Sequence, residues 1–179
     1  MITVYLYEKT GENAGKSTGD FINMSLDSHF GKGTEEKVAK TPLGKPYLEN
    51  GRAFIGVTHT KDLVVIGISD ENFGIDAESL SGSPKNLERI ARRFFSEGEK
   101  EYFYEAVKGS GERKRRFLEI WVKKEAYVKW LGTGFMDLSK ADTAESKGFF
   151  GKIDVPGYEM YVFSEKPTET KVFGKRTEI

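Results

Sequence analysis

"WVKKEAYVKW", residues 121–130, has the spacing of an amphipathic α-helix, but two of its charged residues fall where a buried face is expected. At 3.6 residues per turn, the apolar side chains of this segment gather on one arc of the helix. That arc comprises Phe117, Ile120, Trp121, Tyr127, Val128 and Leu131, and the opposite arc comprises Arg116, Glu119, Lys123 and Ala126. Lys124 projects from the middle of the apolar arc, and Glu125 lies near its edge.

Two explanations are open for these charges. A long charged side chain can run its stem along apolar surface and keep its head in water. Glu125 and Lys129 also form an i,i+4 pair, which stabilises helices by about 0.2–0.5 kcal/mol. Alternatively, the charges belong to a functional site. The helix alone favours the first explanation, so the choice depends on the rest of the chain.

A second unusual group of charges occurs in "FGIDAES", residues 73–79, which alternates in the manner of a strand. Its apolar residues would point into the core, so Asp76 and Glu78 share the opposite face, about 7 Å apart along the strand. Like charges this close repel unless a cation lies between them. Mg²⁺ binds one or two protein carboxylates and completes its shell with water and phosphate. If Glu125 faced the same cleft, three carboxylates would lie beside lysines, which is the composition of a metal–phosphate site.

The composition fits one domain, or two small lobes that share a core, in a chain of 179 residues. There is no cysteine, which excludes disulfides and thiolate metal sites and fits a reducing cytoplasm. His29 and His59 are too few and too far apart to suggest a zinc site. The start, "MITVYLY", is typical of a first strand rather than a signal peptide, and no stretch is apolar enough to span a membrane. We therefore expect a cytoplasmic protein with no membrane partner.

Charge is balanced overall, with 28 basic and 28 acidic residues, but it is unevenly distributed. "ERKRRF" (112–117) and "ERIARRFF" (88–95) gather cations locally. Such runs suggest an anionic partner on one face, although a single run is more commonly a solvated helix face. A nucleic-acid partner would need a basic face with aromatic platforms or a reading helix. The zero net charge and the carboxylate cluster argue against that class.

The order of the predicted elements indicates an α+β fold, built of antiparallel sheets with packed helices. Strands are expected at residues 2–8, 53–60, 62–69, 73–79, 148–155 and 157–165. Helices are expected at residues 20–30, 83–95, 96–107 and 112–132. Pro84 suits the first turn of the second helix, and Ser96 with Glu99 has the spacing of a capping box at the start of the third. Residues 31–51 are polar and glycine-rich and are expected to be mostly loop.

Taken in order, five motifs resemble the 4′-phosphopantetheinyl transferase superfamily over about residues 44–138. They are "GKPYL", "VTHTKDLVVIGIS", "FGIDAES", "IARRFFSEGEKEYF" and "FLEIWVKKEAYVKWLGTGF". Each is weak alone, but Gly-Ile-Asp-x-Glu followed some forty residues later by Trp-x-x-Lys-Glu-Ala-x-x-Lys-x-x-Gly-x-Gly is specific. The resemblance implies a pseudo-dimeric, two-lobed fold: one transferase unit with an abbreviated N-terminal lobe, residues 1–70, and a C-terminal lobe, residues 71–179.

The resemblance also implies a reaction. Such enzymes transfer the 4′-phosphopantetheine arm of coenzyme A to a serine of an apo acyl or peptidyl carrier protein and release 3′,5′-ADP. Carried onto this chain, Asp76, Glu78 and Glu125 are the implied Mg²⁺ ligands, and Lys129 is the implied contact of the pyrophosphate. Glu125 and Lys129 are thus the implied catalytic residues. The serine proton would pass to Glu125 or to a water on the metal, and the sequence does not choose between them.

Further side chains are implied contacts of coenzyme A. Lys45 and His59 would contact its phosphates, with His59 nearest the 3′-phosphate, and Lys124 would contact the same region or the carrier. Thr58 stands where the family often has a serine and keeps the hydroxyl. Two-lobed members also place basic residues in an N-terminal helical segment, and no match to these is found before residue 44.

The implied partner is a carrier protein with an acidic surface around its serine. The candidate receiving residues are Arg113, Lys114, Arg115 and Arg116, with Arg92 and Arg93 as the alternative. We expect a monomer. The alternative function is that of a catalytically weak relative, which binds coenzyme A or a carrier protein without turnover.

Overall fold

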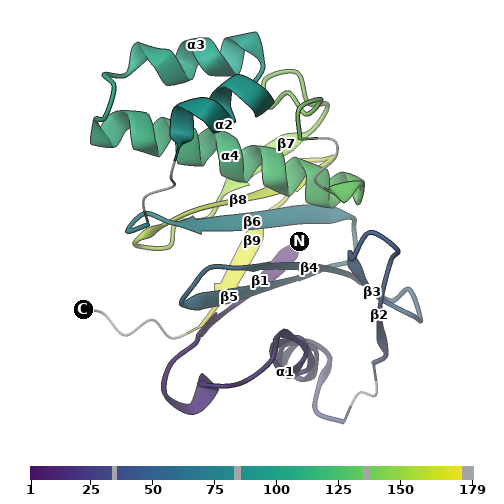
Figure 1. The fold of residues 1–179 in the computed structure, drawn as a ribbon. Helices are drawn as coiled ribbons and strands as arrows, with labels where there is room; N and C mark the ends of the chain where they lie inside the picture. Colours follow the sequence, from purple (N-terminus) through teal and green to yellow (C-terminus); the bar gives the residue numbers. More distant parts are fainter. Residues whose placement is uncertain (34–35, 83–85, 135–137, 175–179) are drawn as a thin grey trace.

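The computed structural model describes residues 1–33, 36–82, 86–134 and 138–174 and has a mixed α+β architecture, as predicted (Figure 1). The strands are β1 (Ile2–Glu8), β2 (Val38–Lys40), β3 (Pro46–Leu48), β4 (Phe54–His59), β5 (Leu63–Ser69), β6 (Phe73–Ser79), β7 (Phe149–Lys152), β8 (Tyr158–Ser164) and β9 (Thr170–Phe173). The helices are η1 (Gly11–Asn13), α1 (Thr18–Phe30), α2 (Leu87–Phe94), α3 (Glu97–Glu105) and α4 (Gly111–Leu131).

Two sheets form the centre of the molecule. The first has the strand order β2-β3-β4-β5-β1-β9, and the second has the order β6-β8-β7. Their pairs are antiparallel except for β1 and β9, which run parallel with Ile2 opposite Thr170. The expectation that residues 31–51 are mostly loop is wrong for β2 and β3, and β9 was not predicted. β9 belongs to the predicted C-terminal lobe, residues 71–179, by its sequence position but lies in the sheet formed by the N-terminal strands.

The elements stack in four layers (Figure 1). The sheets pack face to face over a core that joins β1 and β5 to β6 and β8. Helix α1 covers the other face of the first sheet, and α4 covers the other face of the second. Helices α2 and α3 pack on α4 through a cluster of aromatic and aliphatic side chains. The predicted alternation along β6 is confirmed, because Phe73, Ile75 and Ala77 all belong to the core between the sheets.

Helix α4 is buried on two sides, which the single apolar arc predicted from the sequence does not describe. Ala126, expected at the surface, is fully buried, whereas Leu131, expected in the core, is 42% exposed. The reason is a close approach between α4 and β6. A Cβ placed on Gly74 would lie 1.8 Å from the carbonyl oxygen of Ala126. Only glycine permits this contact, which brings Asp76 of β6 beside the middle of α4.

Two helices begin with a capping box. The Ser96–Glu99 capping box at the start of α3 is confirmed, and a second one, from Ser17 and Asp20, starts α1. Pro84 lies outside the described residues. Within the described ranges, the structure contains no helix with the length and apolar character that crossing a bilayer requires.

Candidate active site

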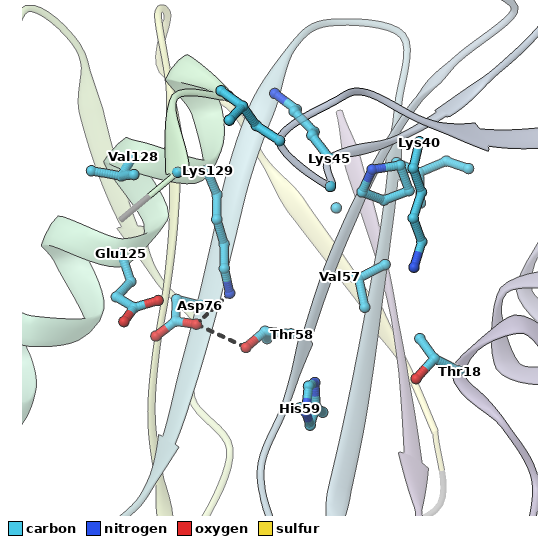
Figure 2. Close-up of a pocket in the computed structure, with 18 of the residues that line it drawn as sticks. Thr18, Lys40, Lys45, Val57, Thr58, His59, Asp76, Glu125, Val128 and Lys129 are labelled. Atoms are coloured by element: carbon cyan, nitrogen blue, oxygen red, sulfur yellow. Dashed lines mark hydrogen bonds and ion pairs between the residues drawn. The ribbon is translucent and has the colours of Figure 1, made fainter. Parts of the chain in front are cut away.

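A cavity of about 860 Å³ lies between the N-terminal elements and the C-terminal ones (Figure 2). One wall comes from α1, β2 and β4, and the other from β6 and α4. Seven of the eight residues predicted to form the site line it: Lys45, Thr58, His59, Asp76, Glu78, Glu125 and Lys129. Cavities of this size bind small ligands and cofactors in many proteins.

Asp76 is the centre of the polar wall. Its side chain is buried, and the Oδ1 atom accepts hydrogen bonds from the Thr58 hydroxyl at 2.8 Å and from the Lys129 ammonium at 2.6 Å (Figure 2). The Oδ2 atom is also buried, and it has no hydrogen-bond partner among the described residues. A buried carboxylate oxygen without a partner is costly, so it indicates a place for a further cation or donor.

The other two carboxylates of the cavity are hard to ionise beside Asp76. Burial, followed by the charge of Asp76, raises the pKa of Glu125 to about 7, while Lys129 opposes the rise. The same two causes, in the same order, raise the pKa of Glu78. Around Asp76, three carboxylates therefore repel one another when all are ionised, and Lys129 is the cation paired with Asp76 there.

The donor set fits a hard divalent cation, because carboxylate oxygens are the ligands that Mg²⁺ prefers. Asp76, Glu78 and Glu125 would hold it. Within the described ranges, however, the structure contains no preassembled group of three or more acidic or histidine side chains around one metal-sized position. Lys129 instead supplies the charge next to Asp76.

Comparison with known proteins shows which family the site-bearing part of the chain resembles. Residues 72–152, which include the three carboxylates and Lys129, match the model of the 4′-phosphopantetheinyl transferase superfamily. This part of the chain is similar to that superfamily. It is 34% identical over 95 residues to the 4′-phosphopantetheinyl transferase gsp of Aneurinibacillus migulanus, covering 53% of this chain and 38% of that protein.

The chain is also similar to two further curated proteins. The chain is 30% identical over 112 residues to the 4′-phosphopantetheinyl transferase HetI of a Nostoc species, covering 61% of this chain and 45% of that protein. It is 34% identical over 93 residues to the 4′-phosphopantetheinyl transferase psf-1 of Bacillus pumilus, covering 51% of this chain and 37% of that protein. The matched part thus spans less than half the length of these superfamily members.

Lys124 is the predicted site residue that does not line the cavity. It is fully buried on the α3 side of α4, where its ammonium donates to Glu99 Oε2 at 2.7 Å and to the carbonyl of Ala141. Glu99 also accepts from the backbone and hydroxyl of Thr143. The predicted contact of Lys124 with phosphate or carrier does not fit this position. The charge in the apolar arc is explained by a buried ion pair, which neither explanation drawn from the sequence had included.

Lys45 lines the cavity, but its ammonium group points away from the cavity and binds two protein acceptors. It donates to the Trp130 carbonyl and to the Asn72 side chain, and burial lowers the pKa of Lys45 to about 8. Lys40, which was not predicted, also lines the cavity, and Figure 2 shows its ammonium directed to the side where Thr18 lies. No sequence signal marks Lys40, because its strand is only three residues long and shows no period.

The predicted docking cations of α4 are largely engaged in the fold. Arg113 is 7% exposed and donates to the Tyr104 carbonyl. Arg116 pairs with Glu105 and Glu112. Helix α2, by contrast, carries three exposed arginines on one face, since they are spaced three and four residues apart: Arg89, Arg92 and Arg93. Phe94, at the end of α2, packs against the cluster that contains Leu138, a residue of the cavity wall.

Proposed function

We propose that this protein transfers the 4′-phosphopantetheine arm of coenzyme A to a serine of an apo acyl or peptidyl carrier protein, acting as a monomer in the cytoplasm. The observation that carries the proposal is the cavity in which Asp76, Glu78, Glu125 and Lys129 meet. The unpartnered oxygen of Asp76 and the repulsion among the three carboxylates support Mg²⁺ as a requirement. When bound, Mg²⁺ would neutralise charge on the pyrophosphate oxygens.

The reaction forms a bond between the serine oxygen and the phosphorus that carries the pantetheine arm. It breaks the bond from that phosphorus to the bridging oxygen of the pyrophosphate, so 3′,5′-ADP leaves. Lys129 is in reach of the same region as Asp76 and would stabilise the charge that develops on the phosphate oxygens. Thr58 keeps Asp76 in place through its hydroxyl. Glu125 is available either as a cation ligand or as the acceptor of the serine proton, and the expected result for its variant separates the two roles.

The direct test is mass spectrometry of an apo carrier protein incubated with this protein, coenzyme A and Mg²⁺. A carrier that gains the mass of one phosphopantetheine arm, and does so only with Mg²⁺, supports the proposal. A carrier that stays apo while coenzyme A binds in isothermal titration calorimetry supports the alternative of a binding protein without turnover.

The second expected result concerns the side chains that we propose to bind the 3′-phosphate of coenzyme A. Lys40 and His59 line the N-terminal side of the cavity, and we expect Lys40→Ala and His59→Ala each to raise the KM for coenzyme A about tenfold. The reason is the loss of a charge-assisted hydrogen bond, which contributes about 1.5–3 kcal/mol. Dephospho-coenzyme A, which lacks the 3′-phosphate, should be affected much less.

Lys61→Ala is the matched control for both changes. Lys61 is exposed, lies two residues beyond His59 and is not part of the cavity wall, so its variant should keep the wild-type KM for both donors. Equal effects of His59→Ala on coenzyme A and dephospho-coenzyme A would mean that His59 only packs beside its strand.

The third expected result concerns the surface that binds the carrier protein. Arg89, Arg92 and Arg93 form an exposed basic face whose helix ends against the cavity wall, so we place the acidic carrier there. Changing Arg92 and Arg93 to Glu should raise the KM for the carrier and flatten its dependence on salt, because rim charges mainly set association rates. The KM for coenzyme A should stay within about twofold, since charges are screened beyond about 8 Å at physiological ionic strength.

Arg115→Glu is the control for this face. Arg115 is exposed on α4 and pairs with Glu112, within the run first predicted to receive the carrier. If Arg115→Glu raises the carrier KM and the α2 variants do not, the docking face lies at the start of α4.

A further inference from the structure

One backbone carbonyl near the cavity, that of Trp130, accepts hydrogen bonds from two other segments of the protein. Lys45 Nζ donates to the carbonyl oxygen of Trp130 at 2.9 Å and to Asn72 Oδ1 at 2.8 Å. Asn72 Nδ2 donates to the same carbonyl at 3.1 Å. The three residues therefore form a closed set of hydrogen bonds, in which one ammonium and one amide hold one oxygen.

That oxygen belongs to the last turn of α4. Trp130 precedes Leu131, where the helix ends, and the left-handed Gly132 follows at φ 72°. Carbonyls of a last helical turn have no partner within the helix, and this end of the helix carries the negative pole of its dipole. The Lys45 ammonium and the Asn72 amide donate hydrogen bonds to such a carbonyl, and the ammonium also offsets the negative pole of the dipole. The Lys45–Asn72 pair therefore acts as a cap for α4.

The lysine half of the cap comes from the other side of the cavity, whereas Asn72 immediately precedes β6 on the same side as α4. Lys45 directly precedes β3 of the first sheet, and Asn72 lies in the connection from β5 to β6. Helix α4 carries Glu125 and Lys129, the latter one residue before Trp130. The contact therefore ties the N-terminal half of the molecule to the helical turn that presents Lys129 to Asp76.

We propose that Lys45 is a positioning residue: it fixes the last turn of α4 against the N-terminal half and thereby holds Lys129 in the cavity. Its expected effect on turnover rests on the proposed transferase function, whereas its effect on α4 does not. This assignment replaces the predicted contact of Lys45 with a phosphate of coenzyme A. The ammonium of Lys45 already has two acceptors, and a phosphate contact would have to break both.

The test compares Lys45→Met, which keeps the stem without the charge, with Lys45→Arg, which keeps the charge. The first readout is amide hydrogen exchange of residues 128–132, followed by mass spectrometry in the absence of substrates. Exchange there should be about tenfold faster in Lys45→Met, the factor that corresponds to one charged hydrogen bond, and closer to wild type in Lys45→Arg. Lys40→Met, on the opposite wall, is the matched control and should leave exchange in α4 unchanged.

The second readout is kinetic. Lys45→Met should lower kcat about tenfold, leave the KM for coenzyme A within about twofold and keep the preference for coenzyme A over dephospho-coenzyme A. Asn72→Ala removes the other half of the cap and should shift exchange and kcat in the same direction, which keeps the proposal testable if Lys45→Met does not fold.

Unchanged exchange in α4, together with a raised KM for coenzyme A but not for dephospho-coenzyme A, would overturn the proposal and restore a phosphate contact. If the wild-type protein shows no transfer at all, the proposed function fails, and the exchange measurement still decides whether Lys45 caps α4.

Discussion

Glu125→Gln is expected to lose transfer activity by at least a hundredfold and, at the same time, to stabilise the metal-free protein at pH 8. The loss follows because charge stabilisation by a metal at a reacting phosphate amounts to several kcal/mol. The gain follows from the environment of Glu125, which is buried beside Asp76 and has its pKa raised to about 7.

The pH dependence of that gain has a definite sign. The pKa of Glu125 is higher in the folded protein than the 4.5 of the free side chain, so its contribution to stability is complete below about pH 4.5 and is lost as the pH rises through 7. Glutamine has no charge to lose. At pH 8 the variant should therefore be more stable by roughly 1–3 kcal/mol, since a tenfold change in proton affinity corresponds to about 1.4 kcal/mol. At pH 4 the two proteins should unfold alike.

Thermal unfolding with and without Mg²⁺ completes this test. Mg²⁺ should raise the Tm of the wild type and lower the apparent pKa of the site, and it should do neither in Glu125→Gln. Asp76→Asn should also lose most activity, and Glu78→Gln should lose less because water can replace an outer ligand. If Mg²⁺ stabilises Glu125→Gln as much as the wild type while turnover is lost, Glu125 is the proton acceptor and not a ligand.

Lys124→Met is expected to cost about 3–5 kcal/mol in the free energy of unfolding, because it leaves the Glu99 carboxylate buried without its cation. Lys124 has no exposed surface, and Glu99 is nearly as buried. Urea denaturation followed by circular dichroism measures the loss. In the folded fraction, the KM for coenzyme A should stay within about twofold, since Lys124 does not line the cavity.

The double variant Glu99→Gln, Lys124→Met is the control for this ion pair. Gln at position 99 keeps the capping box of α3, and the neutral pair removes the stranded charge, so most of the lost stability should return. A Lys124→Met protein as stable as the wild type, with a raised KM for the carrier, would instead place Lys124 at the carrier surface.

Periodicity was sufficient to predict the faces of β6, because a strand has only two faces and one of them was clearly apolar. It could not bring Glu125 to Asp76, since that proximity depends on a backbone contact between Gly74 and Ala126. The family resemblance supplied the link. For α4, the assumption of one buried arc failed because the second sheet and the α2–α3 pair cover different sides of the helix.

The lysines were harder to predict than the carboxylates. A lysine has four rotatable bonds, so its position beside a cavity does not determine where the ammonium lies. Lys45 turns to a helix end, Lys124 to a buried acid and Lys40 into the cavity, and no local pattern distinguishes these outcomes. The short strands β2, β3 and β9 were missed for a related reason, since three or four residues give too few alternations to count.

The parallel pairing of β1 with β9 has a consequence for how the chain acquires its structure. Residues 2–5 are synthesised well before residues 170–173, which are their partners on one side. Until those are synthesised, β1 presents an open edge of backbone donors and acceptors, which is a site for wrong pairing. Contacts this distant in sequence also form slowly, because a long loop must close first. The first sheet therefore cannot be completed as a folding unit until β9 has been synthesised.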